Sequence, residues 1–490
     1  MQNKETNSGK VTTNFIWRLM ERFGAQGVTL LVSIVLARLL DPDVYGSVAL
    51  ITVITTILQV FLDAGFSQAL IQKKDADEID FSSVFYFNIV FGVILYGLLF
   101  LASPLIAKFY KMPELTPVIR VLGLTLIIFS LKSVQQAYVS RHLLFKRFFF
   151  ATLGGTIGAA IIGILFAYLG YGVWALVAQH LFNMLIDTVI LWFTVKWRPK
   201  AVFSWQRLKK LLNYGWKLFV SSLIDTVYND LRQLIIGKMY TKSDLAFYNQ
   251  GKKYTQSIVV SINSSLDSVL LPVMSNAQDD VEKVKQMTRR AIKTSSYLMM
   301  PAMMGIAVCA DAIVDLLLTA KWLPCVPYMR VFCFTFAFYP IHTSNLNAIK
   351  ALGRSDLFLK LEIIKKAVGL VVLFATIWFG PLVMAYSLLF NSILMQIINS
   401  WPNKKLLGYS YLDQLKDMLP QMGLSVLMGV VVYCIHFLHL NDIVTLIIQV
   451  PLGIAIYLLG SKILHIDTFH EMFDLAKKFI PKKKTQEGKA

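Results

Sequence analysis

The chain has 490 residues, of which 56% are hydrophobic and only 16% charged, and it carries a formal net charge of +19. A soluble protein has about a quarter of its residues charged, so much of the apolar surface here is expected to face lipid. The basic residues lie between apolar runs and at the C-terminus, which is typical of membrane proteins and argues against nucleic acid as a partner.

Fourteen apolar segments are long enough to cross a bilayer, for which about 20 mostly apolar residues are needed. They cover residues 14–40, 44–72, 82–107, 116–140, 148–169, 173–195, 211–239, 245–275, 291–318, 326–349, 357–379, 381–401, 418–438 and 442–462. The sequence therefore predicts an all-α integral membrane protein with about 14 transmembrane helices.

The Lys and Arg residues predict the orientation of these spans. With the N-terminus inside, the inner loops hold 24 basic residues in 80 positions, whereas the outer loops hold 5 in 46. Because cytoplasmic loops are enriched in Lys and Arg, both termini are expected in the cytoplasm.

The first two spans have counterparts about 200 residues later in the chain. Three pairs show this, with offsets of 199, 200 and 204: Trp17-Arg18 with Trp216-Lys217, Arg38 with Lys238, and Leu62-Asp63 with Leu266-Asp267. Duplicated bundles are how many transporters are built, with the cargo site between the halves. The predicted organisation is two pseudo-symmetric six-helix lobes plus two C-terminal helices: an N-lobe (1–195), a cytoplasmic linker (196–210), a C-lobe (211–401), spans thirteen and fourteen (402–462) and a basic cytoplasmic tail (463–490).

The linker contains Trp197 and Trp205 among six basic residues. Aromatic and basic residues together suggest a segment that lies at the membrane interface.

Three charged residues open the first span. Arg18 and Arg22 are one helical turn apart and share a face, and Glu21 is close enough to neutralise Arg18 in part. Two interpretations stay open: the arginines extend to the inner headgroups, or they form the wall of a cationic cavity.

The seventh span is the most polar. Asp225, Asn229 and Arg232 fall on one helical face, and Asp230 lies beside it. Lys252 and Lys253 of the eighth span are expected at a similar depth. The cluster is interpreted either as a structural ion pair between helices or as a cavity lining used by cargo or a coupling ion.

Three further aspartates are predicted inside the membrane. Asp63 and Asp267 occupy matched positions at the inner ends of spans two and eight, where a structural role is expected. Asp187 shares a face with His180, which is compatible with a proton relay, but a buried aspartate more often satisfies a neighbouring helix.

Several kinds of site are missing from the sequence. There is no Gly-x-x-x-x-Gly-Lys-Ser/Thr run, so an ATP motor within the chain is not expected. The four cysteines form no Cys-x-x-Cys pair, so no metal site is predicted. No cofactor is expected, and the energy for transport would come from an H⁺ or Na⁺ gradient or from consumption of the product.

Three stretches resemble the polysaccharide transporter, or Wzx-type, family of the multidrug/oligosaccharidyl-lipid/polysaccharide flippase superfamily. They are residues 36–46 (LARLLDPDVYG), 63–71 (DAGFSQALI) and 244–251 (DLAFYNQG). The resemblance extends over nearly the whole chain in the number and order of spans.

This resemblance implies a flippase for undecaprenyl-pyrophosphate-linked oligosaccharides in the bacterial inner membrane, working by alternating access in surface polysaccharide biosynthesis. Membrane lipid and polysaccharide assembly proteins are the other implied partners. By the same resemblance, a cationic cavity would bind the pyrophosphate. Carboxylates in such a cavity would lower the repulsion among its cations or couple an ion, and the candidates for this role are Glu21, Asp225, Asp230 and Asp187. The predicted cationic residues are Arg18, Arg22, Arg232, Lys252 and Lys253.

Two rival functions are compatible with a membrane protein of this composition. An ion-coupled multidrug or cation antiporter of the same superfamily would favour acidic cavity residues, whereas the first span carries two arginines for one glutamate. A membrane glycan polymerase or ligase would need a substantial outer loop, and the predicted outer loops are short. The chain is therefore not expected to be an enzyme.

Overall fold

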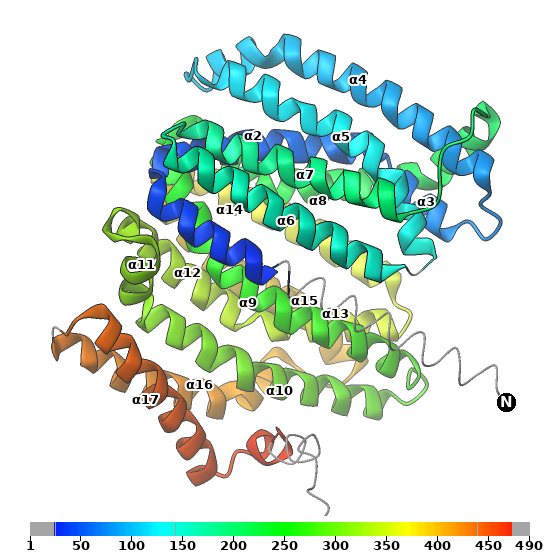
Figure 1. Cartoon of the computed structure of the whole chain (residues 1–490). Coiled ribbons are helices and arrows are strands. Elements are labelled where there is room, and N and C mark those ends of the chain that lie inside the picture. The colour runs from blue at the N-terminus through cyan, green and yellow to red at the C-terminus, as the bar shows by residue number, and fades with distance from the viewer. Residues whose placement is uncertain (1–23, 25, 143, 439, 473–490) are drawn as a thin grey trace, which may run out of the picture. The chain divides into compact units, whose positions relative to one another are not determined.

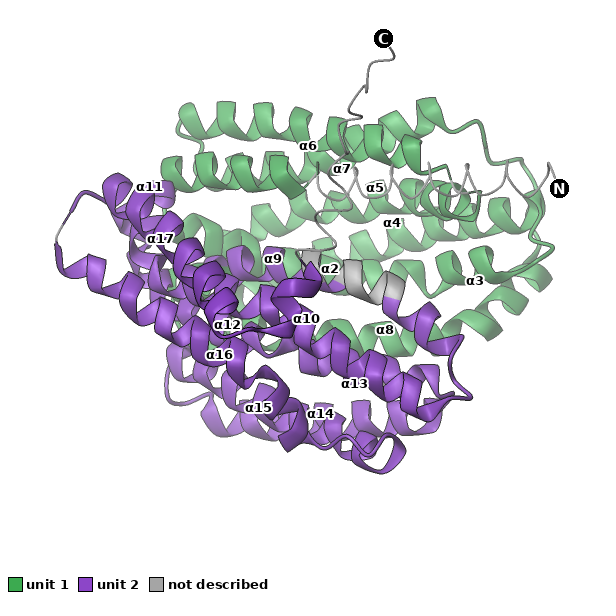
Figure 2. Cartoon of the chain, turned by 90° about the horizontal axis from the view of Figure 1, so that it is seen from below, with its two compact units in different colours: residues 1–249 green, residues 250–490 purple. Residues whose placement is uncertain are grey.

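A computed structural model describes residues 24, 26–142, 144–438 and 440–472, without the side chains of 261, 262 and 264–269. Within these residues every regular element is a helix (Figure 1). The chain divides into two compact units, residues 1–249 and 250–490, which are described separately (Figure 2). The predicted all-α fold is confirmed.

Unit 1 begins with an apolar helix over Gln26–Leu39. The helices that follow are α2 (Pro42–Asp63), α3 (Phe66–Gln72), α4 (Glu78–Phe109), α5 (Leu115–Arg141), α6 (Phe145–Tyr168), α7 (Val173–Thr194) and α8 (Trp205–Met239). The start of α9 (Lys242–Ser275) also belongs to this unit.

Unit 2 contains the rest of α9 and the C-terminal helices. These are α10 (Val281–Val308), α11 (Ala310–Leu318), the 3₁₀ helix η1 (Ala320–Cys325), α12 (Val326–Ala337), α13 (Tyr339–Ala351), α14 (Ser355–Thr376), α15 (Pro381–Leu406), α16 (Tyr411–Cys434), η2 (Ile435–Leu438) and α17 (Asp442–Ile463).

Eight of the described helices are long and apolar enough to cross a membrane, and α10 with α11 forms a ninth candidate bent by 67°. Among the other predicted spans, α8 and α9 are too polar and the segment of α12 and α13 is interrupted, whereas the segment 14–40 is described only in part. The count of 14 therefore stays a prediction, although the helix bounds follow the predicted segments closely.

Small residues bring α6 and α7 together. Ala151, Gly155, Ala159 and Gly163 recur at every fourth position of α6 and are all buried. A Cβ on Gly155 would lie 2.9 Å from the carbonyl oxygen of Asn183 on α7. Since lipid supplies little hydrophobic drive between helices, such close backbone approach is what holds a membrane helix pair.

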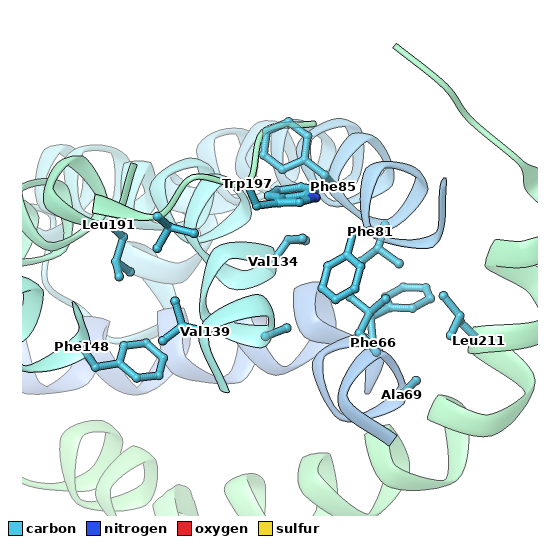
Figure 3. Close-up of a cluster of buried hydrophobic side chains, with 14 of the residues drawn as sticks. Phe66, Ala69, Phe81, Phe85, Val134, Val139, Phe148, Leu191, Trp197 and Leu211 are labelled. Carbon is cyan, nitrogen blue, oxygen red and sulfur yellow. The ribbon is translucent and has the colours of Figure 1, made fainter. Parts of the chain in front are cut away.

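The segment before α8 is fixed to the core of unit 1. Trp197 is only 5% exposed and lies close to Phe81 and Phe85 (Figure 3). Its ring centroid is 5.8 Å from that of Phe81 and 6.1 Å from that of Tyr138. The backbone N–H groups of Lys200 and Ser204 donate to the hydroxyls of two adjacent serines of α4, at 3.0 and 2.9 Å. This aromatic cluster buries Trp197, whereas Trp205 is 61% exposed, and the interfacial position of the linker stays a prediction.

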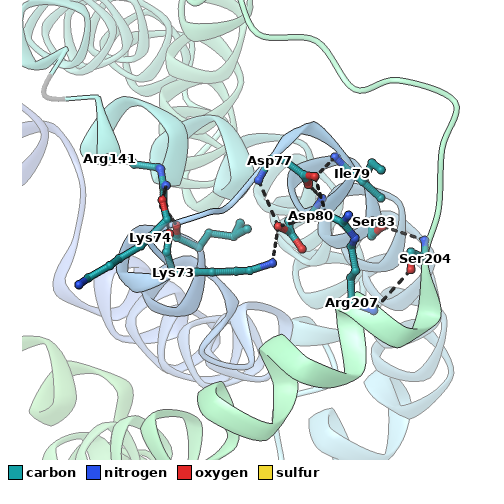
Figure 4. Close-up of polar contacts among 10 residues, drawn as sticks. Lys73, Lys74, Asp77, Ile79, Asp80, Ser83, Arg141, Ser204 and Arg207 are labelled. Atoms are coloured by element: carbon teal, nitrogen blue, oxygen red, sulfur yellow. Dashed lines mark hydrogen bonds and ion pairs between the residues drawn. The ribbon is translucent and has the colours of Figure 1, made fainter.

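A charged cluster surrounds the start of α4 (Figure 4). Asp77 caps the helix by accepting from the N–H groups of Ile79 and Asp80 at 3.1 Å, and Lys73 binds Asp80 at 2.6 Å. Arg207 of α8 pairs with Asp77. Partial desolvation opposes the effect, but hydrogen bonds from Asp80 and Arg207 hold the pKa of Asp77 below its ordinary value. The cluster joins the start of α8 to α4.

A break separates α2 from α3. Ala64 and Gly65 both adopt left-handed conformations, with φ of 44° and 75°. A Cβ at Gly65 would overlap the carbonyl of Gly215, so α8 packs directly against the break. Glycine is required at this position both for its backbone angle and for the close approach.

Candidate functional site

The middle of α8 presents three exposed polar side chains. Ser222, Asp225 and Asn229 lie on one helical face and are all exposed. Asp225 is about 21 Å from the end of α8 at 1.5 Å per residue, so it falls near the centre of a hydrocarbon layer about 30 Å thick. Polar and charged side chains at that depth are too costly to face lipid. This face of α8, Ser222–Asp225–Asn229, is therefore expected to border water or a polar cargo.

The opposite face of α8 is apolar. Trp216, Val220 and Ile224 follow one another at every fourth position and are 50%, 38% and 49% exposed. From Trp216 to Leu231 no residue of α8 is buried. The two faces thus differ in chemistry at the same depth, which is typical of a helix between lipid and a hydrated space.

Arg232 differs from Asp225 and Asn229, with which it shares the predicted polar face, because it is buried with 7% exposure. It lies where α8 enters its packed C-terminal portion, near buried Ile236 and Gly237. A Cβ on Gly237 would lie 2.9 Å from a methyl group of Leu50 on α2. Asp230 accepts a hydrogen bond from Gln233 at 2.8 Å. The predicted polar face is therefore exposed at Asp225 and Asn229 and buried at Arg232.

Lys252 and Lys253 belong to unit 2. Gly251, which precedes them on α9, packs against α12, where a Cβ would lie 2.8 Å from the backbone nitrogen of Met329. Lys252 is half-buried and Lys253 is exposed.

Asp187 is satisfied by a neighbouring helix. Its carboxylate forms an ion pair with Lys132 of α5, and the two side chains are only 8% and 12% exposed. His180 on the same helix is exposed. Lys132 escaped the sequence analysis, although it is a charged residue in the middle of an otherwise apolar segment.

Asp63 is the last residue of α2 and accepts a hydrogen bond from the Ser67 hydroxyl across the break to α3. Its predicted structural role stays a prediction. The Asp267 side chain and the predicted residues Arg18, Glu21 and Arg22 lie outside the described part of the chain, as does the tail beyond residue 472.

A second buried charged group in unit 2 was also missed. Lys365 of α14 is 5% exposed and pairs with Glu362. On the preceding helix, α13, His342 contacts Asn399 of α15, with 2.6 Å between the two nitrogens. The sequence could have indicated Lys365 as a buried charge, since this lysine lies inside the predicted apolar span 357–379.

The described residues contain no group of three or more His, Cys, Asp or Glu that could hold a metal ion. Cys309, Cys325 and Cys333 are buried and free. The arrangement offers polar and charged surface at membrane depth rather than a set of reacting groups.

The helices and the polar face of α8 define a multi-pass membrane protein of the transporter type. The family model for polysaccharide biosynthesis proteins matches residues 35–327, more than half of the chain. The chain belongs to this family of polysaccharide biosynthesis proteins, and the resemblance to polysaccharide transporters is confirmed. The expectation that it is not an enzyme agrees with this membership.

Two curated relatives and one solved structure illustrate the similarity. The teichuronic acid biosynthesis protein TuaB of Bacillus subtilis is 27% identical over 312 residues, which cover 62% of this chain and 63% of TuaB. The lipopolysaccharide biosynthesis protein WzxC of Escherichia coli K12 is 22% identical over 83% of this chain and 85% of WzxC. The lipid II flippase MurJ in an inward closed conformation shares the fold, with a TM-score of 0.76 and 16% identity over 92% of this chain and 99% of MurJ.

Proposed function

We propose that this chain flips undecaprenyl-pyrophosphate-linked oligosaccharide repeat units from the inner to the outer leaflet of a bacterial inner membrane for surface polysaccharide biosynthesis. Both termini lie in the cytoplasm in this proposal, and polysaccharide assembly proteins are the partners that receive the cargo. Membership of the polysaccharide biosynthesis family and the names of the relatives support the proposal.

The observation that carries the proposal is the polar face of α8 at mid-membrane depth. An oligosaccharide is polar and a pyrophosphate is anionic, so neither crosses a hydrocarbon layer without hydrogen-bonding and charged groups along its path. Ser222, Asp225 and Asn229 are exposed and provide hydrogen-bonding groups at that depth.

The proposed roles follow from the charges. Arg18, Arg22, Arg232, Lys252 and Lys253 bind the pyrophosphate, and arginine suits it through its planar fork of donors. Glu21, Asp225 and Asp230 lower the repulsion among these cations when the site is empty, and they bind the coupling ion, H⁺ or Na⁺. Asp187 is omitted from this set because its carboxylate is paired with Lys132.

The proposal is tested in cells that lack the chain's own gene. Lipid-linked repeat units should accumulate in the inner leaflet and surface polysaccharide should disappear, and the intact gene should reverse both. The double variant R18A/R22A should insert in the membrane at normal levels but fail to restore export. Normal surface polysaccharide in that variant would show that the two arginines do not bind the cargo.

Purified protein in proteoliposomes separates the flippase from the antiporter. A flippase should make the lipid-linked oligosaccharide accessible to a glycosidase added outside, and it should not move ethidium along an H⁺ or Na⁺ gradient. Ethidium transport without movement of the oligosaccharide would overturn the proposal in favour of the antiporter.

A further inference from the structure

A groove lies between the start of α14 and the end of α15 in unit 2. Its volume is about 520 Å³, and its floor and walls are mostly apolar. Leu357, Leu361 and Ile364 of α14 face Ile398 of α15 across it. The apolar lining extends over about 10 Å of α14, from Leu357 to Ile364, at 1.5 Å per residue.

The groove has a basic rim. Arg354, Lys360 and Lys405 line it together with Trp401, which is 70% exposed. Arg354 is neutralised by Asp356, which it binds through two hydrogen bonds of 2.9 Å. Lys360 and Lys405 are exposed, and the described part of the chain gives neither of them an acidic partner. The rim thus carries about two uncompensated positive charges.

The position of the rim fits the level of lipid headgroups. Residues 350–366 and 402–416 are both predicted inner loops, and the apolar lining of α14 lies where the first of them overlaps the start of the predicted span 357–379. Tryptophan is enriched at that level of a membrane, where its ring is partly apolar and partly hydrated. Basic pockets between helices on the cytoplasmic side bind anionic headgroups.

We propose that this groove binds one anionic phospholipid of the surrounding bilayer. Its phosphate lies near Lys360 and Lys405, and an acyl chain lies against Leu357, Leu361, Ile364 and Ile398. A free phosphate ion would leave the apolar walls exposed, and a zwitterionic lipid would not neutralise the rim. The phospholipid satisfies both features of the groove, and the site is independent of the transported cargo.

Trp401 allows a direct measurement with the full-length protein. The protein is reconstituted in phosphatidylcholine vesicles that contain phosphatidylglycerol with brominated acyl chains, which quench tryptophans that they contact. Subtracting the signal of the W401F variant removes the contribution of the other tryptophans. Quenching by brominated phosphatidylglycerol should exceed quenching by brominated phosphatidylcholine at the same mole fraction.

The charged rim is tested by the double variant K360Q/K405Q. A basic residue near anionic lipid contributes on the order of a fivefold preference, so losing two should lower the preference for phosphatidylglycerol by about 25-fold, to near one. The matched control K404Q/K416Q removes two exposed lysines from the predicted inner loop 402–416 that lie outside the groove, and it should keep the wild-type preference. Equal preference in both double variants would refute the role of the rim.

The apolar walls are tested by a separate variant, I364W, which fills the groove without changing its charge. Quenching of Trp401 should fall for both brominated lipids, after subtraction of a matched W401F/I364W double variant. Unchanged quenching would overturn the proposed acyl-chain position. If inorganic phosphate or undecaprenyl pyrophosphate displaces brominated phosphatidylglycerol at a much lower concentration than phosphatidylglycerol itself does, the occupant is not a resident phospholipid and the proposal fails.

Discussion

The Ser243 hydroxyl donates a hydrogen bond to the Asp43 carboxylate, and the two residues are 200 positions apart. That separation is the period of the predicted repeat, so the contact joins equivalent turns of its two copies. Gly46 follows Asp43 on α2, and a Cβ at Gly46 would overlap the carbonyl of Lys242. Lys242 also pairs with Glu114. All these residues lie in unit 1 and in predicted outer loops or next to them, so the two turns are joined on that side.

The contact at Gly46 predicts the effect of a single methyl group. The variant G46A should separate the two turns, because the new Cβ has no room beside the backbone of Lys242. In a C434S background, which removes the exposed native cysteine, a cysteine introduced by S243C should react several-fold faster with a membrane-impermeant maleimide when G46A is present. The variant G97A is the control, since a Cβ there meets nothing within 4 Å. Equal rates for G46A and the control would show that the contact does not close this side.

The ion pair between Glu114 and Lys242 predicts a pH dependence. The hydrogen bond from Lys242 holds the pKa of Glu114 below its ordinary value of 4.5. A carboxylate with a lowered pKa in the folded state stabilises the fold above its unfolded pKa, and this contribution is lost as the pH falls through the folded value. The difference in thermal unfolding midpoint between the wild type and E114Q should therefore be present at pH 7 and shrink below about pH 4.5. The effect is small because Glu114 is largely hydrated. A difference that grows on acidification contradicts the assignment.

The buried pair of Lys132 and Asp187 predicts a large loss of stability from one substitution. K132M leaves an unpaired buried carboxylate and should lower the free energy of unfolding by about 3–5 kcal/mol. The double variant K132M/D187L should recover most of this loss, because it removes both charges. Thermal unfolding of the purified protein measures both.

Transport assays on the same variants separate a structural from a relay role for Asp187. A structural pair predicts that K132M/D187L still transports, whereas a proton relay predicts that every variant at Asp187 is inactive. Inactive but stable K132M/D187L would therefore restore the relay hypothesis.

The two faces of α8 predict different sensitivity to alanine. D225A/N229A should lower the rate of flipping by about tenfold, because it removes two polar groups from the path of the cargo. V220A/I224A changes the opposite, apolar face and should leave the rate within about twofold of the wild type. Movement of the lipid-linked oligosaccharide in proteoliposomes is the measurement. If the apolar variant is the slower one, the polar face does not border the path.

The helix bounds were the most predictable feature of this fold. The segments predicted at 173–195 and 442–462 agree within one residue with α7 and α17. Their ends are predictable because the length of an apolar run matches the thickness of the hydrocarbon layer that it crosses. The breaks within spans were not predicted. The break at Ala64 and Gly65 depends on the approach of α8, and the 67° bend between α10 and α11 has no glycine or proline at the bend itself to indicate it.

The candidate site was only partly predictable for a related reason. The sequence identified Asp187 as a buried carboxylate, but its partner Lys132 comes from a different helix, and helical periodicity places residues only on their own helix. Likewise, Arg232 shares a face with Asp225 by spacing, yet packing at the C-terminal portion of α8 buries Arg232 and leaves Asp225 exposed. Charge and depth can be inferred from one segment, whereas partners and accessibility depend on the neighbours.

Ser204 fixes the N-terminal end of α8 to α4. Its N–H is bound to the Ser83 hydroxyl, and its own side chain caps α8 through the N–H of Arg207. Ser204 thus both ends the segment that is bound to α4 and caps α8. If α8 tilts, either α4 tilts with it or these hydrogen bonds break. The two helices are therefore expected to move together as one rigid body.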